Sequence, residues 1–323
     1  MVEESGPHPI GGVDYPRTLL EFNDWFCSEA ACLAYLRRVR WRQSFRCPQC
    51  AGSEAWLTNT GHLKCRKCRR RTSLTAGTIF ERTQKPLRVW FQAMWYLTSQ
   101  KSGGSALGLH QVLGLGSCQT AWSWLHKPRR AMVRSGRDRL NGFVEVDETY
   151  VGGEEEGVRG RQTEEKAIVV VAAEQDGRGI GRIRLQRVPD VSSESLHGFI
   201  EKSVTAGSVV HTDGWKGYNN IAKKGYTHKV TIISQSDDLA HKLMPRVHRV
   251  ASLLKRWLLG THPGAVSEMH LDYYLDEFTF RFNRRRSRAR GLLFYRLLQN
   301  AVQVDPVPYR QLVGGSSRSD HNM

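Results

Sequence analysis

The chain has 323 residues, enough for about two or three domains. Its 48 Lys and Arg outnumber 31 Asp and Glu, and the net charge of +17 predicts a polyanionic partner, most commonly nucleic acid. No run of about 18 apolar residues, signal-peptide pattern, lipidation signal or basic amphipathic helix is found, which argues against a membrane protein. We therefore expect a cytoplasmic protein whose seven cysteines stay reduced.

The first elements are predicted to be a disordered leader and a helical segment. Residues 1–15 contain Gly and Pro and few apolar side chains, as disordered segments do. Residues 16–43 carry aromatic and aliphatic side chains near helical spacing. We expect residues 16–43 to form an N-terminal helical segment.

Two closely spaced cysteine pairs dominate residues 44–78. They read Cys47-Pro-Gln-Cys50 and Cys65-Arg-Lys-Cys68. Two residues between cysteines let both thiolates reach one ion, and two such pairs complete a tetrahedral sulfur shell that favours zinc. The alternative is two disulfides or four unrelated thiols. The pattern predicts a zinc ribbon with structural zinc, and the surrounding cations are predicted to contact DNA: Arg66, Lys67, Arg69, Arg70 and Arg71.

Residues 79–135 are predicted to be helical and to bind DNA. A helix follows Pro86, and Gly103-Gly104 interrupts the chain before a second helix over residues 105–115. A third helix follows the glycine-flanked turn and ends in Arg129 and Arg130, which we predict to contact DNA. The order resembles a helix-turn-helix, although plain trihelical packing gives the same pattern.

Residues 140–303 change in character and predict a mixed α/β domain. Three strands are expected over residues 143–150, 167–173 and 182–188, followed by a helix, two further strands and late helices. The first strand carries Asp147 on the face that it shares with Phe143, Glu145 and Thr149. The last residues, 304–323, are predicted to be a disordered tail.

Two aspartates are candidates for metal ligands. Asp147 interrupts a strand, and Asp213 ends the strand over residues 208–213. A buried carboxylate is costly unless it is paired or binds a metal, although a strand-end aspartate can also simply cap a turn. Two carboxylates on neighbouring strands can share Mg²⁺ ions, which support phosphoryl displacement.

Four stretches resemble insertion-sequence transposases of the DDE type, which have an RNase H-like catalytic core. Residues 146–153 (Val-Asp-Glu-Thr-Tyr-Val-Gly-Gly) resemble the first-aspartate motif, and residues 211–218 (His-Thr-Asp-Gly-Trp-Lys-Gly-Tyr) resemble the second. Residues 254–262 resemble the third-motif helix, and residues 274–285 resemble a further block. The zinc ribbon is typical of one branch, and the resemblance covers roughly residues 15–303.

The resemblance implies a catalytic site of Asp147, Asp213 and a third residue from a late helix, holding Mg²⁺ or Mn²⁺. Where the family usually has Glu, two helical turns before the lysine of the third motif, this sequence has His248 before Lys255. The third role is therefore carried to His248, whose imidazole suits softer metals than Mg²⁺. A plain surface histidine is the alternative, and the rival third carboxylates are Glu268, Asp276 and Glu277.

The resemblance further implies a transposase that binds terminal inverted repeats and catalyses DNA strand cleavage and strand transfer. Its partners would be double-stranded DNA, both element ends and target, and other copies of itself in a homo-oligomer, associated with the nucleoid. Lys255 is assigned to the catalytic set, approaching the DNA backbone or the scissile phosphate. Arg284, Arg285 and Arg286 are predicted to contact DNA because clustered cations neutralise phosphates; for all four, a solvated face is the alternative. The alternatives are a nuclease without strand transfer and a transposase-derived DNA-binding regulator without catalysis.

Overall fold

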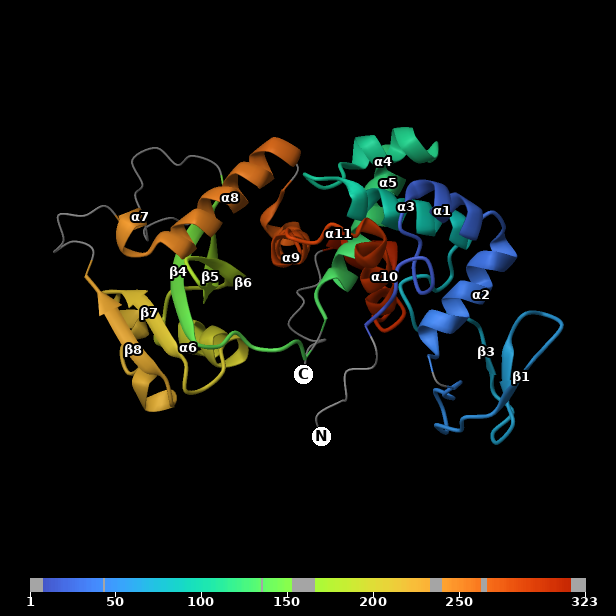
Figure 1. Cartoon of the computed structure of the whole chain (residues 1–323), viewed down its shortest axis with the longest axis horizontal. Coiled ribbons are helices and arrows are strands. Elements are labelled where there is room, and N and C mark those ends of the chain that lie inside the picture. The colour runs from blue at the N-terminus through green and yellow to red at the C-terminus, as the bar shows by residue number, and fades with distance from the viewer. Residues whose placement is uncertain are drawn as a thin grey trace. The chain divides into compact units, whose positions relative to one another are not determined.

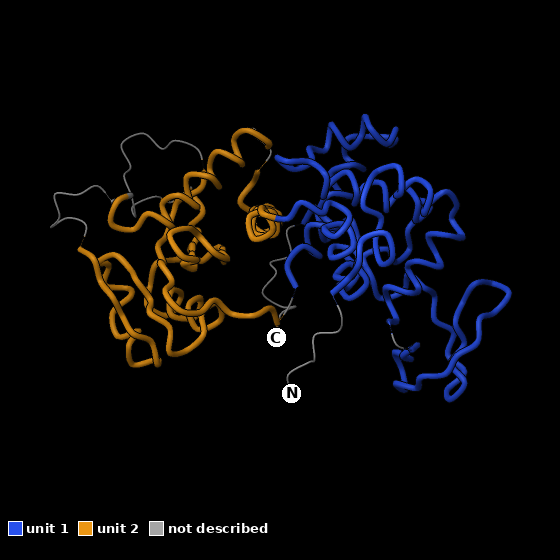
Figure 2. Tube along the Cα trace, in the orientation of Figure 1, with its two compact units in different colours: residues 1–134, 287–316 blue, residues 135–286, 317–323 orange. Residues whose placement is uncertain are grey.

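The structure is a computed structural model, and it describes residues 8–42, 44–134, 136–152, 166–232, 240–262 and 266–314. The chain forms two compact units (Figure 2). The first unit contains residues 1–134 and 287–316, and the second contains mainly residues 135–286. The second unit is thus inserted into the sequence of the first. Among the described residues, no helix combines the length and the apolar character that a membrane crossing requires.

Seven helices are described in the first unit (Figure 1). Four of them begin at a hydroxyl side chain that accepts a hydrogen bond from a backbone amide of the first turn, namely Thr18, Ser28, Ser105 and Ser117. The helices are α1 (Leu19–Trp25), α2 (Glu29–Arg40), α3 (Leu87–Ser99), α4 (Ala106–Leu113), α5 (Cys118–Met132), α10 (Arg290–Ala301) and α11 (Tyr309–Gly314).

The turn between α4 and α5 resembles that of a helix-turn-helix. Gly114 ends α4 in the left-handed conformation, at φ 58°, and Ser117 caps α5. The two helices pack against each other. This arrangement agrees with the helical, helix-turn-helix-like segment expected from the sequence.

Helix α10 completes the core of the first unit. Phe294 is fully buried, and its ring lies 5.4 Å from that of Phe22 and 5.7 Å from that of Phe91, measured between centroids. Gly291 lies so close to the carbonyl oxygen of Pro16 that a Cβ would come within 1.6 Å of it, so only glycine fits. Whereas the sequence placed residues up to 303 with the catalytic domain and the rest in a tail, α10 and α11 both pack on helices of the first unit.

The cysteine-rich segment forms a small antiparallel sheet of three short strands. The strands are β1 (Ala55–Leu57), β2 (Leu63–Cys65) and β3 (Arg71–Thr72), in that order across the sheet. Phe45 and Leu63 are buried beside Cys47 and Cys65, and together they form a hydrophobic cluster that is separate from the other cores. This small apolar core is typical of a metal-stabilised module.

The second unit is built on a mixed five-stranded sheet with the order β6-β5-β4-β7-β8 (Figure 1). Strands β4, β5 and β6 pair antiparallel, whereas β7 pairs parallel with both β4 and β8. The strands are β4 (Phe143–Val151), β5 (Ala167–Asp176), β6 (Gly179–Val188), β7 (Val209–Asp213) and β8 (Thr227–Thr231).

Helices cover both faces of this sheet, each over its own apolar core. One face packs against α8 (Pro245–Thr261) and α9 (Leu271–Asn283), and the other against α6 (Ser193–Ser203). Shorter elements are α7 (Ala240–Leu243) and the 3₁₀ turns η2 (Lys216–Tyr218), η3 (Ile221–Lys224) and η5 (Glu268–His270). Three antiparallel strands followed by two parallel ones, with helices on both faces, confirm the expected RNase H-like sheet.

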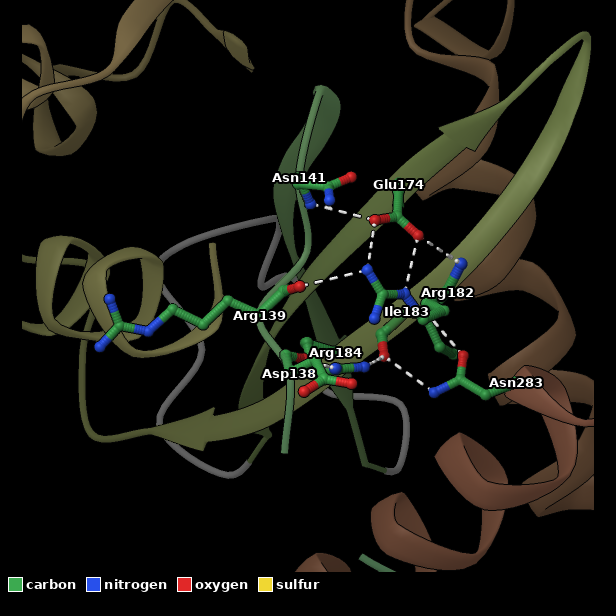
Figure 3. Close-up of polar contacts among 8 residues, drawn as sticks. All are labelled: Asp138, Arg139, Asn141, Glu174, Arg182, Ile183, Arg184 and Asn283. Atoms are coloured by element: carbon green, nitrogen blue, oxygen red, sulfur yellow. Dashed lines mark hydrogen bonds and ion pairs between the residues drawn. The ribbon is translucent and has the colours of Figure 1, made fainter. Parts of the chain in front are cut away.

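Polar contacts tie the segment that enters the second unit to the β5–β6 hairpin (Figure 3). Glu174 accepts hydrogen bonds from the backbone amide of Asn141, at 3.0 Å, and from the Arg182 guanidinium, at 2.8 Å. Arg182 also donates to the carbonyl oxygen of Arg139, at 3.2 Å, and Arg184 donates to that of Asp138. Residues 138–141 are thereby fixed along β5 and β6.

The segment that leaves the second unit is tied to the same strand. The Asn283 side chain, at the end of α9, accepts from the amide of Ile183 at 2.7 Å and donates to the carbonyl oxygen of Ile183 at 3.2 Å (Figure 3). The first and the last segments of the second unit are therefore both anchored at residues 182–184 of β6.

Candidate active site

Asp147 and Asp213 end up on neighbouring parallel strands in matching positions. The parallel ladder pairs Phe143 with Val209 and Glu145 with His211. Asp147 and Asp213 each lie two residues beyond the last of these pairs, and side chains two residues apart share a face. The alternation of side chains therefore places both carboxylates on the α8 side of the sheet.

Backbone amides orient the two aspartates. The Oδ1 atom of Asp147 accepts from the amide of Glu148 at 2.9 Å, and the Oδ1 atom of Asp213 accepts from the amide of Trp215 at 3.0 Å. The second contact is an Asx-type turn that fixes the carboxylate at the end of β7. A turn-capping role and a metal-ligand role are compatible for Asp213, because a carboxylate has two oxygen atoms that can accept separate partners.

The pKa of a buried tyrosine hydroxyl is affected by the negative charges at this end of the sheet. Tyr218 is fully buried and donates to the Glu148 carboxylate at 3.0 Å. Burial raises the pKa of Tyr218 well above its ordinary value, and the negative charges of Glu148, Asp147 and Asp213 raise it further. The three carboxylates thus concentrate negative charge within reach of one hydroxyl.

Helix α8 brings His248 close to the carboxylate of Asp147. The Nε2 atom of His248 lies 3.9 Å from the Oδ2 atom of Asp147, and the two side chains are 28% and 16% exposed. The Nε2 atom itself is shielded from solvent, so it faces the protein interior near Asp147. Asp147 of β4 and His248 of α8 thus approach each other, and Asp213 lies at the end of the neighbouring strand β7.

The rival carboxylates belong to a different part of the second unit. Helix α9 packs against β6, which lies two strands away from β4. Glu277 is fully buried and pairs with Arg281 at 2.8 Å, and Glu268 pairs with Arg187 at 2.8 Å. Asp276 is also buried, in α9. Their positions favour His248 as the partner of Asp147.

Lys255 lies on α8 two turns beyond His248, and its side chain is exposed. Burial of part of the chain lowers the pKa of Lys255, and the positive charge of Lys166 lowers it further. Lys166 directly precedes β5, whose first residue pairs with Val151 at the end of β4. Two cations therefore flank the end of the sheet that carries the aspartates.

The donor set at this end of the sheet suits a divalent cation. Two carboxylates offer the oxygen ligands that Mg²⁺ and Mn²⁺ prefer, and the imidazole of His248 is a better ligand for Mn²⁺ than for Mg²⁺. Asp147, Asp213 and His248 are the residues that would hold the ion.

The four ribbon cysteines converge as a tetrahedral zinc site requires. One sulfur atom from each cysteine lies within 4.8 Å of the others. The Sγ atoms of Cys47 and Cys68 are 3.4 Å apart, and those of Cys50 and Cys65 are 3.6 Å apart. These spacings fit four thiolates at about 2.3 Å from one zinc ion.

The predicted ribbon cations are all exposed, but they differ in their partners. Arg66 pairs with Glu54 at 3.4 Å, and Arg70 donates to Gln49 at 3.5 Å. The guanidinium of Arg69 instead lies over the Trp56 ring, 5.2 Å from its centroid. The set Arg66, Lys67, Arg69, Arg70 and Arg71 therefore forms an exposed basic surface, part of which is paired within the ribbon.

One row across the ribbon sheet combines an aromatic ring with two cations. The register places Trp56 beside Lys64 and Lys64 beside Arg71, and the Lys64 ammonium lies 5.4 Å from the Trp56 ring centroid. We call Trp56, Lys64, Arg69 and Arg71 the ribbon face. Lys64 and Trp56 were not among the predicted DNA contacts.

The prediction for Arg129 is wrong, because this side chain is only 1% exposed and donates to the carbonyl oxygen of Gly104. A buried guanidinium has no access to a phosphate. The neighbouring Arg130 is half-buried. The sequence shows that α5 ends in basic residues. It does not show which of them face the core, because that depends on how the helix packs.

Three predicted cations after α9 have partners within the second unit. Arg284 lies over the Phe280 ring at 4.2 Å, and Arg285 lies over the Phe282 ring at 4.1 Å. Arg285 also donates to the carbonyl oxygens of residues 180 and 181, and Arg286 pairs with Asp176 at 2.6 Å. These contacts hold the β5–β6 hairpin against the end of α9.

Sequence reasoning missed Glu145 and Arg246, which form a buried ion pair beside the site, with 2.6 Å between the carboxylate and the guanidinium. The signal was present, because Glu145 shares the strand face of Asp147. Its helical partner could not be found without knowing how α8 crosses the sheet.

Two solved structures share limited similarity with the chain. The simian T-cell lymphotropic virus intasome in complex with PP2A regulatory subunit B56 gamma is 14% identical, with a TM-score of 0.30, over 62% of this chain and 74% of that chain. The Mos1 strand transfer complex is 11% identical, with a TM-score of 0.26, over 70% of this chain and 78% of that chain.

Sequence comparisons are more specific. An uncharacterized protein in transposable element ISH50 of Halobacterium salinarum is 26% identical over 279 residues, which are 79% of this chain and 91% of that protein. Residues 27–71 match the family model of the transposase zinc-ribbon domain, and residues 139–283 match that of the ISXO2-like transposase domain. The chain therefore belongs to the insertion-sequence transposases that carry a zinc ribbon ahead of an ISXO2-like transposase domain.

Proposed function

We propose that this transposase binds the terminal inverted repeats of a mobile element and catalyses metal-dependent DNA strand cleavage and strand transfer. The observation that carries the proposal is the approach of His248 on α8 to Asp147 on β4, next to the strand that ends in Asp213. Asp147 and Asp213 occupy matching positions on β4 and β7, and His248 approaches Asp147 to 3.9 Å.

In the proposed reaction, the carboxylates of Asp147 and Asp213 and the imidazole of His248 would hold the divalent cations. Bound Mg²⁺ or Mn²⁺ supplies activation of the attacking oxygen and stabilisation of the leaving oxygen. Water first attacks the phosphodiester at the element end and leaves a 3′-hydroxyl. That hydroxyl then attacks a phosphodiester of the target DNA: one phosphodiester forms, the bond to the target's own 3′-oxygen breaks, and that oxygen leaves as a 3′-hydroxyl.

The exposed side chains around the site favour a polyanionic substrate. Lys255 projects from α8 beyond His248, and the charge of Lys166 acts on it. The negative carboxylate group would otherwise repel a phosphate, so cations beside it are required for DNA to approach. We infer that Lys255 contacts the DNA backbone near the cleaved bond.

A second DNA contact is proposed at the ribbon face. Lys64 and Arg71 lie side by side on β2 and β3, and Trp56 holds the Arg69 guanidinium in place. Each phosphate that such cations neutralise releases counterions and makes binding salt-dependent. The ribbon, together with α4 and α5, would bind the inverted repeats. Because two element ends must meet for strand transfer, we also propose that the protein acts as a homo-oligomer.

DNA bearing the ends of the element tests the proposal. The protein is incubated with a labelled fragment in Mg²⁺ or Mn²⁺, with a target plasmid present and with Asp147→Asn as the inactive control. Nicks at the element end together with joined products support the proposed function. Nicks without joining indicate a nuclease, and a mobility shift without breakage indicates a DNA-binding regulator.

A further inference from the structure

Helix α8 begins without a capping side chain of its own. Its N-cap residue is Met244, which makes no side-chain hydrogen bond, and its first residue is Pro245, which has no amide hydrogen. The amide of His248 is the first to enter the helical ladder, donating to the carbonyl oxygen of Met244 at 3.5 Å. The amides of Arg246 and Val247 therefore need acceptors from elsewhere, because buried amides rarely stay unpaired.

Glu145 of β4 supplies the acceptor for both amides from about a hundred residues away in the sequence. Its Oε2 atom accepts from the amide of Arg246 at 2.7 Å and from the amide of Val247 at 3.1 Å. Its Oε1 atom accepts from the Arg246 guanidinium at 2.6 Å. The Glu145 side chain is 1% exposed, so all of these bonds form away from water.

This clamp joins the two elements that carry the metal-ligand candidates. Glu145 precedes Asp147 by two residues on the same face of β4, so both side chains point toward α8. Val247, whose amide it binds, directly precedes His248. The first turn of α8 is thus fixed to β4 at the point where the 3.9 Å approach of His248 to Asp147 is set.

A buried carboxylate is costly, and an apolar residue would pack this face of β4 at less cost. Such a residue would leave two amides and one guanidinium without acceptors and would let the start of α8 shift. We propose that Glu145 is a positioning residue, which holds the first turn of α8 so that His248 and Asp147 share one divalent cation. The inference rests on the proposed function, because it concerns the same site.

Glu174 of β5 provides a matched control. Its carboxylate is also buried and also accepts from two backbone amides, those of Asn141 at 3.0 Å and Arg182 at 3.3 Å, and from one arginine side chain (Figure 3). Its partners lie in residues 138–141 and on β6, not on α8. Replacing Glu174 by Gln removes the same kind of group from the same sheet without touching the first turn of α8.

The experiment compares Glu145→Gln with Glu174→Gln in the full, zinc-loaded chain. Mn²⁺ affinity is measured by electron paramagnetic resonance, with Asp147→Asn identifying the signal from this site. Hydrogen exchange is followed in peptides from the first turns of α8, and thermal melts verify folding. A third variant, Arg246→Lys, keeps the Glu145 carboxylate on the two amides and alters only contacts of the Arg246 side chain, namely the ion pair and the bond to the carbonyl oxygen of Gly179.

We expect Glu145→Gln to weaken Mn²⁺ binding by about 10–100-fold, the range found when groups that orient metal ligands are removed. Exchange should accelerate in the first turns of α8, and strand cleavage should fall in parallel while DNA binding stays within about twofold. Glu174→Gln and Arg246→Lys should keep Mn²⁺ affinity within about twofold of the parent. Should Glu145→Gln fail to fold, Glu145→Asp, which withdraws the carboxylate by one methylene, is expected to give the same loss.

Equal Mn²⁺ losses in Glu145→Gln and Glu174→Gln would overturn the inference, as would faster α8 exchange with unchanged Mn²⁺ affinity. A parent protein that binds Mn²⁺ but cleaves no DNA would refute the proposed function alone, because the exchange and Mn²⁺ measurements still decide the role of Glu145. A parent that binds no Mn²⁺ at this site would overturn both.

Discussion

Loss of one zinc ligand should unfold the ribbon and leave the rest of the protein folded. The perturbation is Cys47→Ser, which removes one of the four converging sulfurs. Besides the ligating cysteines, only Phe45 and Leu63 are buried in the ribbon cluster, and each contributes about 1.5–3 kcal/mol. A structural zinc ion contributes about 10–16 kcal/mol, so the metal decides whether this module folds.

Zinc content and hydrogen exchange provide the assay. The parent protein should hold one zinc ion per chain, and the variant should hold none after dialysis. Exchange should become fast in β1 to β3 but stay slow in α3, whose core lies outside the ribbon. Cys27→Ser is the matched control, because Cys27 is exposed and is not one of the clustered cysteines. Unchanged zinc in Cys47→Ser, or a protected β2 without zinc, would refute the reasoning.

The remaining predictions concern the site and the DNA contacts. Asp147→Asn and Asp213→Asn should each abolish cleavage in a gel assay yet retain DNA binding, and parental cleavage by either variant would contradict the metal-ligand assignment. His248→Ala should strongly lower the cleavage rate. His248→Glu should retain or raise activity in Mg²⁺, because carboxylates are the better ligands for this ion. Full activity in the alanine variant would mean that another residue is the third metal ligand. Lys64→Ala and Arg71→Ala should each lower the slope of log affinity against log salt concentration for DNA binding by about one unit. Arg285→Ala loses hydrogen bonds to the carbonyl oxygens of residues 180 and 181, so it should lower the melting temperature and leave that slope unchanged.

Much of the fold could be predicted from local patterns. The alternation at residues 143–150 and the apolar run at 167–173 identify the strands that form β4 and β5, because periodicity and burial act locally. The paired cysteines likewise predict the ribbon, since short-range spacing alone decides whether both thiolates reach one ion. The helix caps at Ser105 and Ser117 agree with the predicted helix starts.

Contacts between distant segments could not be predicted in the same way. The side of α5 that faces the core depends on its packing partners. The sequence therefore suggested that Arg129 was an exposed cation, although it is buried. The clamp between Glu145 and the start of α8 depends on how that helix crosses the sheet. Nothing in the local pattern of residues 290–301 says that they join helices from the other end of the chain.

The insertion of one unit into the other bears on how the protein is made and how it can be divided. A nascent chain that ends before residue 290 lacks Phe294, so the aromatic side chains that meet it, Phe22, Phe26, Phe91 and Trp95, have no final partner. The amino-terminal half must therefore wait for the last helices to emerge from the ribosome before its core can close. A fragment that stops at residue 134 should be unstable and prone to aggregation. Joining residues 287–314 to it through a short linker should restore its folding.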